Sequence, residues 1–349
     1  MPRIPVTLES HWKEFFNALP ESEFHHGHSY FPRLAEDCGT PFPVSPLHQL
    51  GLLSLHGSDT RQFLQGQLTA DVEALHAGQS CLAAHCDAKG RMQSNFYLYC
   101  HTEQHYLLQM PQQTVPIAQA ALEKYAAFSS VELTDYSSQY AAFALPMPCP
   151  INLTSSEIHF TIPTAAGYVE WVKGDVLAQL PRQLPPHWPE EITWQGSAVW
   201  QQQLLNAGIG FVAVKTVGEW IPQMLNLDRL DGISFNKGCY TGQEIIARMK
   251  YRGQVKRRSY RFFARLNNNI DNASITAGDT LSQVSNDGTT KTPIGTVVDA
   301  IPENSDKHAW QGLAVIKTQS ASASLRLQTD TGIEVEIIAS ELDNNEDAP

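Results

Sequence analysis

The stretch KGCYTGQE, residues 237–244, places one cysteine between two glycines in front of a helix-like sequence. Thr241 and Glu244 have the S/T-x-x-E spacing of a capping box, which predicts a helix that begins at Thr241. A thiolate at Cys239 would be stabilised by the positive end of that helix and by the charge of Lys237. The spacing therefore indicates a reactive thiol beside a site that attracts anions.

The two glycines of this stretch extend the same interpretation. Gly238 and Gly242 leave room for a ligand to approach the backbone closely. The alternative is that Cys239 is a small buried side chain in a glycine-rich bend, as many single cysteines are. The spacing alone does not assign a reaction to the thiol, since no histidine lies within the motif.

The charge of the chain is unevenly distributed. The formal net charge is −12, which argues against general binding of nucleic acid. Residues 229–261 nevertheless carry a net charge of +7, so the rest of the chain carries −19. Tyr240, Tyr251 and Tyr260 lie among these cations, a mixture that proteins binding single-stranded nucleic acid also use. The segment predicts a local site for an anionic ligand, with RNA as the alternative.

Periodic patterns indicate the elements that must position this segment. The sequence predicts a short amphipathic helix from Trp12 to Leu19, a strand, turn and helix over 52–72, and a β-hairpin about residues 87–90. Helices are also expected over 117–127 and 197–210. From residue 256 six short strands follow without an intervening helix, which predicts an antiparallel barrel or sandwich.

Composition indicates a cytoplasmic protein. The N-terminal residues lack the apolar core of a secretory signal, and no stretch approaches the roughly 18 uninterrupted apolar residues of a membrane span. The six cysteines are scattered without a C-x-x-C pair, as expected in a reducing compartment. Three histidines at 25, 26 and 28 lack accompanying carboxylates or cysteines, so no metal site is predicted.

Beyond these patterns, KGCYTGQE resembles the signature of the YgfZ family, folate-binding proteins linked to tRNA modification and to iron–sulfur protein maintenance. Further segments resemble the family in the same order: FLQGQLTADV (63–72), AAHCDAKGRM (83–92), LEKYAAFSSV (122–131), IPQMLNL (221–227) and GISFNKGCYTGQEIIARMKYRG (232–253). The resemblance covers about residues 47–345 and relates the chain to the aminomethyltransferase of the glycine cleavage system.

The resemblance implies an α+β fold, a three-domain ring in which two mixed α/β domains and a C-terminal antiparallel β-barrel surround a central folate channel. The chain then divides into an N-terminal extension with the short helix (1–45), the folate-binding region of two interleaved domains (46–254), the barrel (255–341) and an acidic tail (342–349).

The resemblance also implies the site. Tetrahydrofolate or a derivative would bind at Trp200 and at Leu50, where the family has an aromatic residue. The motif would contribute Lys237, Tyr240, Gln243 and Glu244, and the basic segment, with Arg248 and Arg252, would receive the anionic glutamate tail. Gln93 and Ser94 stand where the aminomethyltransferases carry paired aspartates, and neither can act as a carboxylate base.

We therefore expect a folate-binding accessory protein that supports iron–sulfur enzymes, such as tRNA methylthiotransferases, with Cys239 as an essential thiol. A folate-dependent one-carbon transferase or demethylase is the first alternative, with His85 or Asp87 as its base. An RNA-binding module that uses residues 229–261 is the second. Ligation of a cluster by Cys239 is weaker, because a [4Fe–4S] cluster needs about four thiolates.

Overall fold

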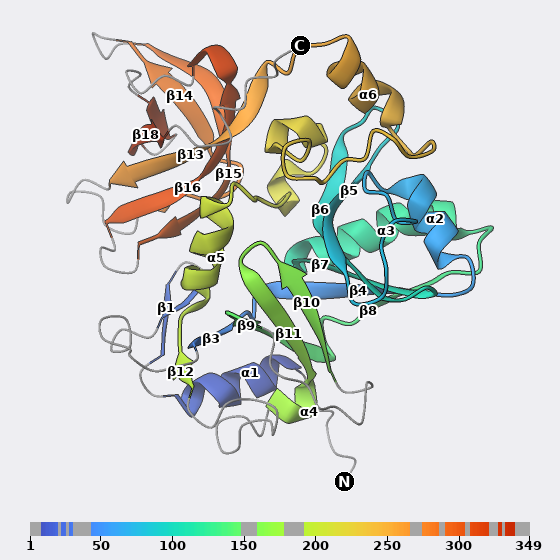
Figure 1. Ribbon diagram of the computed structural model, residues 1–349. Helices are drawn as coiled ribbons and strands as arrows, with labels where there is room; N and C mark the ends of the chain where they lie inside the picture. The colour runs from blue at the N-terminus through green and yellow to red at the C-terminus, as the bar shows by residue number, and fades with distance from the viewer. Residues whose placement is uncertain are drawn as a thin grey trace.

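The structure is a computed structural model of the 349-residue chain. It describes residues 8–19, 22–25, 28–30, 43–147, 159–177, 192–265, 274–285, 290–303, 308–320, 327–329 and 332–338. The expected acidic tail at 342–349, Cys38, Cys149 and His26 lie outside the described residues. Figure 1 shows three bodies, a barrel and two sheets, arranged around α5.

The first body is a five-stranded sheet with two helices on one face. Its strand order is β5-β6-β7-β4-β8, and its pairs are antiparallel. Apolar residues of α2 and α3 form one core with this face, while the other face packs toward the second body. The elements are β4 (Leu50–His56), α2 (Thr60–Gln67), β5 (Ser80–Cys86), β6 (Met92–Thr102), β7 (His105–Pro111), η1 (Gln112–Thr114), α3 (Val115–Ala126) and β8 (Glu132–Asp135).

The second body is a sheet of order β10-β11-β9-β3-β12, in which the parallel pair β3–β12 joins distant parts of the chain. The N-terminal helix α1 packs on it through Phe15, which is fully buried against Phe143 and Trp194. The elements are α1 (Leu8–Asn17), β3 (Pro43–Pro46), β9 (Tyr140–Leu145), β10 (His159–Thr164), β11 (Gly167–Lys173), α4 (Gly174–Leu177) and β12 (Thr193–Trp194). Strands β1 (Glu23–His25) and β2 (His28–Tyr30) form a separate two-stranded sheet.

The third body is a closed antiparallel barrel of order β13-β16-β15-β14-β17-β18 with its own apolar interior. Helix α5 and a largely irregular segment lead from the second body to it. The elements are α5 (Ser197–Asn206), η2 (Val214–Thr216), η3 (Pro222–Leu225), α6 (Gln243–Tyr251), β13 (Arg257–Arg265), β14 (Thr280–Val284), β15 (Lys291–Pro302), β16 (Ala309–Lys317), η4 (Thr318–Ser320), β17 (Leu327–Thr329) and β18 (Glu334–Ile338).

Two further cores hold the bodies together. One contains Leu52 and Tyr97 of the first sheet, Trp171 of the second and Trp200 of α5. The other joins the tip of the β5–β6 hairpin, the segment that leads to α6, and β15 and β16 of the barrel. Each body therefore buries apolar surface against its neighbours as well as within itself.

The structure confirms the predicted fold class of mixed domains followed by a C-terminal antiparallel barrel. The amphipathic helix forms at 8–17 and the hairpin turns at 87–90. Helix α5 ends at Asn206, just before Gly208 with φ +73°. Among the described helices, none is long and apolar enough to cross a membrane.

Candidate functional site

The loop that carries Cys239 lies against α2 and the β5–β6 hairpin, and the thiol itself is exposed. The Lys237 ammonium donates to the carbonyl oxygens of Leu68 (2.8 Å) and Ala70 (2.6 Å), and it lies 5.1 Å from the centre of the Tyr240 ring. Burial lowers the pKa of Lys237 to about 8. Lys237 and Tyr240 thus hold the loop in place, while Cys239 faces solvent.

The predicted capping box is wrong. Helix α6 begins at Gln243, its N-cap is Gly242 with φ +84°, and no side chain caps it. The Thr241 hydroxyl donates to the Gln67 side chain (3.2 Å), and its N–H donates to the Gly66 carbonyl (3.2 Å). Contacts with α2 therefore take the groups that a local cap would have used.

The two glycines of the motif differ in purpose. A Cβ on Gly242 would lie 2.5 Å from the Asp87 carbonyl oxygen, so this glycine serves packing against the hairpin rather than access by a ligand. A Cβ on Gly238 would meet no described atom within 4 Å. The sequence predicted open space beside both glycines. Among the described atoms, the space beside Gly238 is open and the space beside Gly242 is filled by the hairpin.

The hairpin places the alternative bases away from the second body. Asp87 Oδ1 accepts from the N–H groups of Lys89 and Arg91, each at 2.9 Å, and so fixes the turn. His85 and Ser94 are a cross-strand pair, both 1% exposed, and the His85 ring contacts Tyr125 of α3. Burial lowers the pKa of His85 to about 4. The side chains of His85 and Ser94 therefore lie on the face of the sheet that α2 and α3 cover.

Gln93 lies on the opposite face of β6 because successive side chains of a strand alternate. Asn95, two residues further, shares that face and binds the segment after α5 through the Gly210 carbonyl (2.8 Å) and the Val212 N–H (2.7 Å). Of Gln93 and Ser94, Gln93 alone points toward the inner side of the sheet. Sequence reasoning missed the structural role of Asn95.

Trp200 and Leu50, predicted as folate contacts, line one cavity of about 420 Å³. Its walls come from the start of β4, from the end of β7 and η1, from α5 and from β15 of the barrel. Trp200 is buried, and its Nε1–H has no hydrogen-bond partner among the described residues. The cavity lies where the three bodies meet, and its described lining contains no lysine or arginine.

The barrel contributes a carboxylate to this cavity. Asp299 accepts a hydrogen bond from the Gln201 side-chain amide and another from the Ala300 N–H (2.9 Å). Burial raises the pKa of Asp299 to about 6, against the opposing effect of these hydrogen bonds. Sequence reasoning missed Asp299 and Gln201; an aspartate within the apolar strand IGTVVDA was the available signal.

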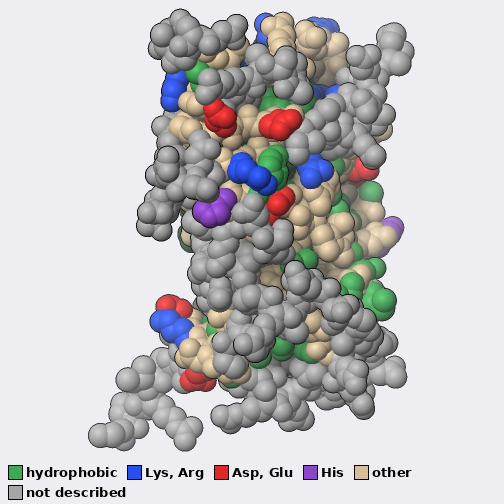
Figure 2. All heavy atoms as spheres, turned by 90° about the vertical axis from the view of Figure 1, so that its left-hand side faces the viewer, with side chains coloured by type: hydrophobic (Ala, Val, Ile, Leu, Met, Phe, Trp, Pro, Cys, Tyr) green, Lys and Arg blue, Asp and Glu red, His purple; other side chains and the backbone are tan. Residues whose placement is uncertain are grey.

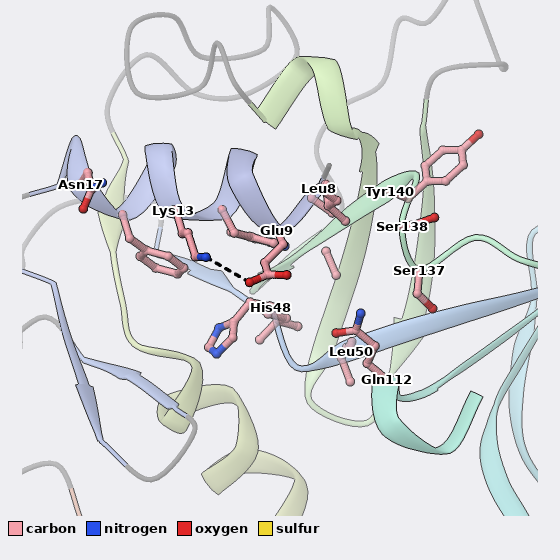
Figure 3. A pocket seen from close by; sticks show the side chains of 15 residues that line it. Leu8, Glu9, Lys13, Asn17, His48, Leu50, Gln112, Ser137, Ser138 and Tyr140 are labelled. Carbon is pink, nitrogen blue, oxygen red and sulfur yellow. Dashed lines mark ion pairs between the residues drawn. The ribbon is translucent and has the colours of Figure 1, made fainter. Parts of the chain in front are cut away.

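A second, larger cavity of about 680 Å³ adjoins the first and shares His48, Leu50 and Gln112 with it. Figure 3 shows α1 along one side, with the Glu9–Lys13 ion pair (3.1 Å) facing His48 and Gln112. Trp12 and Phe16 of α1 supply a stacked aromatic pair to its wall. The N-terminal helix therefore helps to form a cavity beside the predicted folate contacts.

The basic segment lies apart from both cavities. Arg248 and Arg252 are exposed on α6 and just after it, and Lys250 lines a third cavity of about 420 Å³ between α6 and β13. Gln243 and Glu244 also lie on α6, with Glu244 exposed and Gln243 partly buried. On the face shown in Figure 2, described acidic and basic side chains are interspersed. The structure thus does not bring Arg248 or Arg252 together with Trp200.

Comparisons with known proteins agree with this architecture. A family model described as the GCVT N-terminal domain matches residues 43–151. The crystal structure of glycine cleavage system aminomethyltransferase T from Bartonella henselae superposes with a TM-score of 0.63 at 15% identity and covers 86% of each chain. The fold is therefore that of the aminomethyltransferases.

Similar proteins from bacteria carry the name tRNA-modifying protein YgfZ. The one from Yersinia pestis (strain Pestoides F) is 31% identical over 312 residues, which span 84% of this chain and 90% of the relative. The one from Serratia proteamaculans (strain 568) is 34% identical over 238 residues, or 63% of this chain and 70% of the relative. The chain belongs to the YgfZ family.

Proposed function

We propose that this protein binds tetrahydrofolate or a derivative in the cavity lined by Trp200 and Leu50, and that it supports tRNA modification as an accessory protein. One observation carries the proposal: two residues that are 150 positions apart in the chain line the same cavity. A flat, polar heteroaromatic ligand would stack on the Trp200 indole and form hydrogen bonds with the amides and carboxylate around it.

Binding without aminomethyl transfer fits the groups that are present. Gln93 stands on the inner face of β6 without a carboxylate, and His85 and Ser94 are buried behind the sheet. A base for the reacting folate nitrogen would have to be ionisable and within hydrogen-bond reach of that nitrogen, and neither Gln93 nor Ser94 is ionisable. A transferase or demethylase is therefore the less favoured alternative.

We assign Cys239 a role in handling the sulfur or iron–sulfur chemistry of client enzymes, such as tRNA methylthiotransferases. Its exposure on a rigidly held loop supports this assignment, because a thiol can react only where a partner can reach it. Cys86 and Cys100 are buried and Cys81 is partly buried, so none of these three offers the same access. In this proposal the client enzyme, not this protein, modifies the tRNA. The extent of that modification would then depend on the Cys239 thiol.

Calorimetric titration of the purified protein with tetrahydrofolate tests the folate site. We expect Trp200→Leu to weaken binding at least about tenfold, since stacking on an aromatic ring contributes about 1–3 kcal/mol. Trp200→Phe keeps an aromatic face and should weaken binding less. Absence of binding by the wild type, or equal affinity of the wild type and Trp200→Leu, would contradict the proposal.

Complementation of a strain that lacks the gene tests the thiol. Cys239→Ala should fail to restore methylthiolated tRNA, while the matched variant Cys81→Ala should restore it. Both variants remove one sulfur atom, and protein levels are compared by immunoblot. Full restoration by Cys239→Ala would show that the thiol is dispensable.

Direct contact with RNA is a second candidate function. Its specific support is a run of exposed cations around the end of α6: Arg248, Lys250, Arg252, Lys256 and Arg257. Phosphate binding by these side chains would make affinity for tRNA fall steeply as salt rises. Replacing Arg252, Lys256 and Arg257 by glutamine should then weaken binding and flatten its salt dependence, and unchanged binding would dismiss the candidate.

A further inference from the structure

The function proposed above does not specify which group of the ligand the carboxylate on the barrel side of the Trp200 cavity binds. Asp299 follows a register shift in β15, between Val297 and Asp299, where Val298 has no partner of its own on β16. As a result, Val298 and Asp299 both line the cavity, opposite Trp200 and Gln201 of α5. The irregular strand thus brings a charged group of the barrel to a site otherwise built by the other two bodies.

The Asp299 carboxylate retains capacity for a ligand. An ionised carboxylate can accept about four hydrogen bonds, and two are made here, one from Gln201 and one from Ala300. None of the described residues that line the cavity is a lysine or arginine, and Asp299 has no ion-pair partner among the described residues. The negative charge is therefore left for a ligand to neutralise with its own N–H donors.

The surrounding groups narrow the chemistry of that ligand. The Gln201 amide donates to Oδ2 and the Ala300 N–H donates to Oδ1, so each carboxylate oxygen keeps a lone pair for a further donor. Trp200, adjacent to Gln201 on α5, offers a flat ring and a buried Nε1–H without a partner among the described residues. A planar ring with two neighbouring N–H donors on one edge, as in an amidine or guanidine, could stack on the indole ring and donate to the carboxylate. The indole N–H would pair with an acceptor elsewhere on the ligand.

We propose that Asp299 is a specificity residue that accepts two hydrogen bonds from the 2-amino group and the adjacent N3–H of the pteridine ring. Gln201 acts as a positioning residue that orients the carboxylate. This inference rests on the proposed folate site and adds the orientation of the ligand within it: the amino-pyrimidine edge faces the barrel. No bond to carbon forms or breaks in this step.

Calorimetric titration of the full chain with tetrahydrofolate at pH 7.5, under anaerobic conditions, tests the inference. Asp299→Asn keeps the shape of the side chain but replaces one acceptor oxygen and removes the charge, so the dissociation constant should rise about 10- to 100-fold. Gln201→Leu should raise it by a smaller factor. Glu336→Gln removes a carboxylate from an exposed position on β18 of the same barrel and should leave the affinity unchanged.

A change on the ligand separates recognition from general disruption. A tetrahydrofolate analogue with a methyl group in place of the 2-amino group should bind the wild type at least about tenfold more weakly. Asp299→Asn should bind this analogue and tetrahydrofolate with similar affinities, because the lost partner is the same in both cases. Thermal melting of each variant confirms that the fold is retained.

The outcomes distinguish the inference from the function on which it rests. Wild-type binding with an Asp299→Asn affinity within twofold would overturn the role of Asp299 and leave the folate site standing. Equal discrimination against the analogue by wild type and variant would do the same. If the wild type binds no tetrahydrofolate, the proposed site fails and the inference fails with it.

Discussion

Neighbouring residues of the KGCYTGQE segment divide between anchoring and exposure. The Lys237 ammonium donates to two backbone carbonyls of the segment after α2. Its hydrogen bonds therefore hold the loop in place. Cys239, two residues later, is exposed. A glycine between them, with open space beside it, allows the chain to pass from one environment to the other.

His85 makes the stability of the protein sensitive to acid. Its ring is 1% exposed, neither ring nitrogen has a hydrogen-bond partner among the described residues, and burial lowers its pKa to about 4. The unfolded chain takes up a proton near pH 6.5, whereas the folded one resists until about pH 4. The free energy of unfolding should therefore fall as pH drops from 6.5 to 4, by roughly 3 kcal/mol from this residue.

Urea unfolding of the wild type and of His85→Leu at pH 7 and pH 4.5 measures this effect. Between these two pH values, the free energy of unfolding should fall less in the variant than in the wild type. His101 and His105, whose pKa values burial also lowers, should still contribute to the fall that remains in the variant. His76→Leu, at an exposed position, should keep the wild-type dependence. An identical acid response in wild type and His85→Leu would contradict the assignment.

At the scale of elements, α6 is positioned by one glycine. Gly242 has φ +84°, and a Cβ there would lie 2.5 Å from the Asp87 carbonyl of the hairpin. Gly242→Ala should therefore destabilise the fold by about 2–3 kcal/mol, through the left-handed backbone and the steric conflict together. The shift of α6 away from the hairpin should also disturb the loop that presents Cys239.

Gly238→Ala is the matched control, since its Cβ would meet no described atom within 4 Å. It should change the free energy of unfolding by less than about 0.5 kcal/mol, as ordinary surface substitutions do. Chemical unfolding of both variants decides the comparison. Equal stability of Gly242→Ala and Gly238→Ala would contradict the prediction and show that the hairpin moves to accommodate the added methyl group at little cost.

The elements themselves were largely predictable from sequence, because their signals are local. Alternating apolar residues about the turn at 87–90 predicted the β5–β6 hairpin, and six such runs predicted the barrel strands. The start of α6 was not predictable in this way. Thr241 forms its contacts with α2, some 170 residues earlier in the chain, and no pattern within the motif reports that partner.

The candidate site was predictable only in part for the same reason. Trp200 and Leu50 were found through family resemblance, and the structure places them in one cavity. Asp299 and Gln112 reach that cavity from segments that are distant in sequence, and the orientation of Asp299 depends on an irregularity in β15. Arg248 and Arg252, predicted from their charge, lie on α6 and just after it and do not line the cavity. The charge of a segment does not show which part of the folded protein its side chains face.

At the scale of the whole molecule, the cavity exists only where the three bodies meet, so its shape depends on how the barrel is held. A buried ion pair provides one such link. Arg258 of β13 donates to both carboxylate oxygens of Asp228 at 3.0 Å, and to the Gln223 carbonyl (3.0 Å) and the Asn226 side chain (3.1 Å). These partners belong to or follow η3, in the segment that connects α5 to α6.

Removing one member of this pair should be costly. Arg258→Met leaves the Asp228 carboxylate, whose side chain is 10% exposed, without its partner, so the free energy of unfolding should fall by about 3–5 kcal/mol. The double variant Arg258→Met/Asp228→Leu removes both charges and should recover part of that loss. Lys13→Met breaks the exposed Glu9–Lys13 pair and should cost less than about 0.5 kcal/mol. If the ion pair also maintains the shape of the cavity, folate affinity should fall in Arg258→Met and return in the double variant. A loss of stability with unchanged affinity would show that the ion pair stabilises the fold without affecting the cavity.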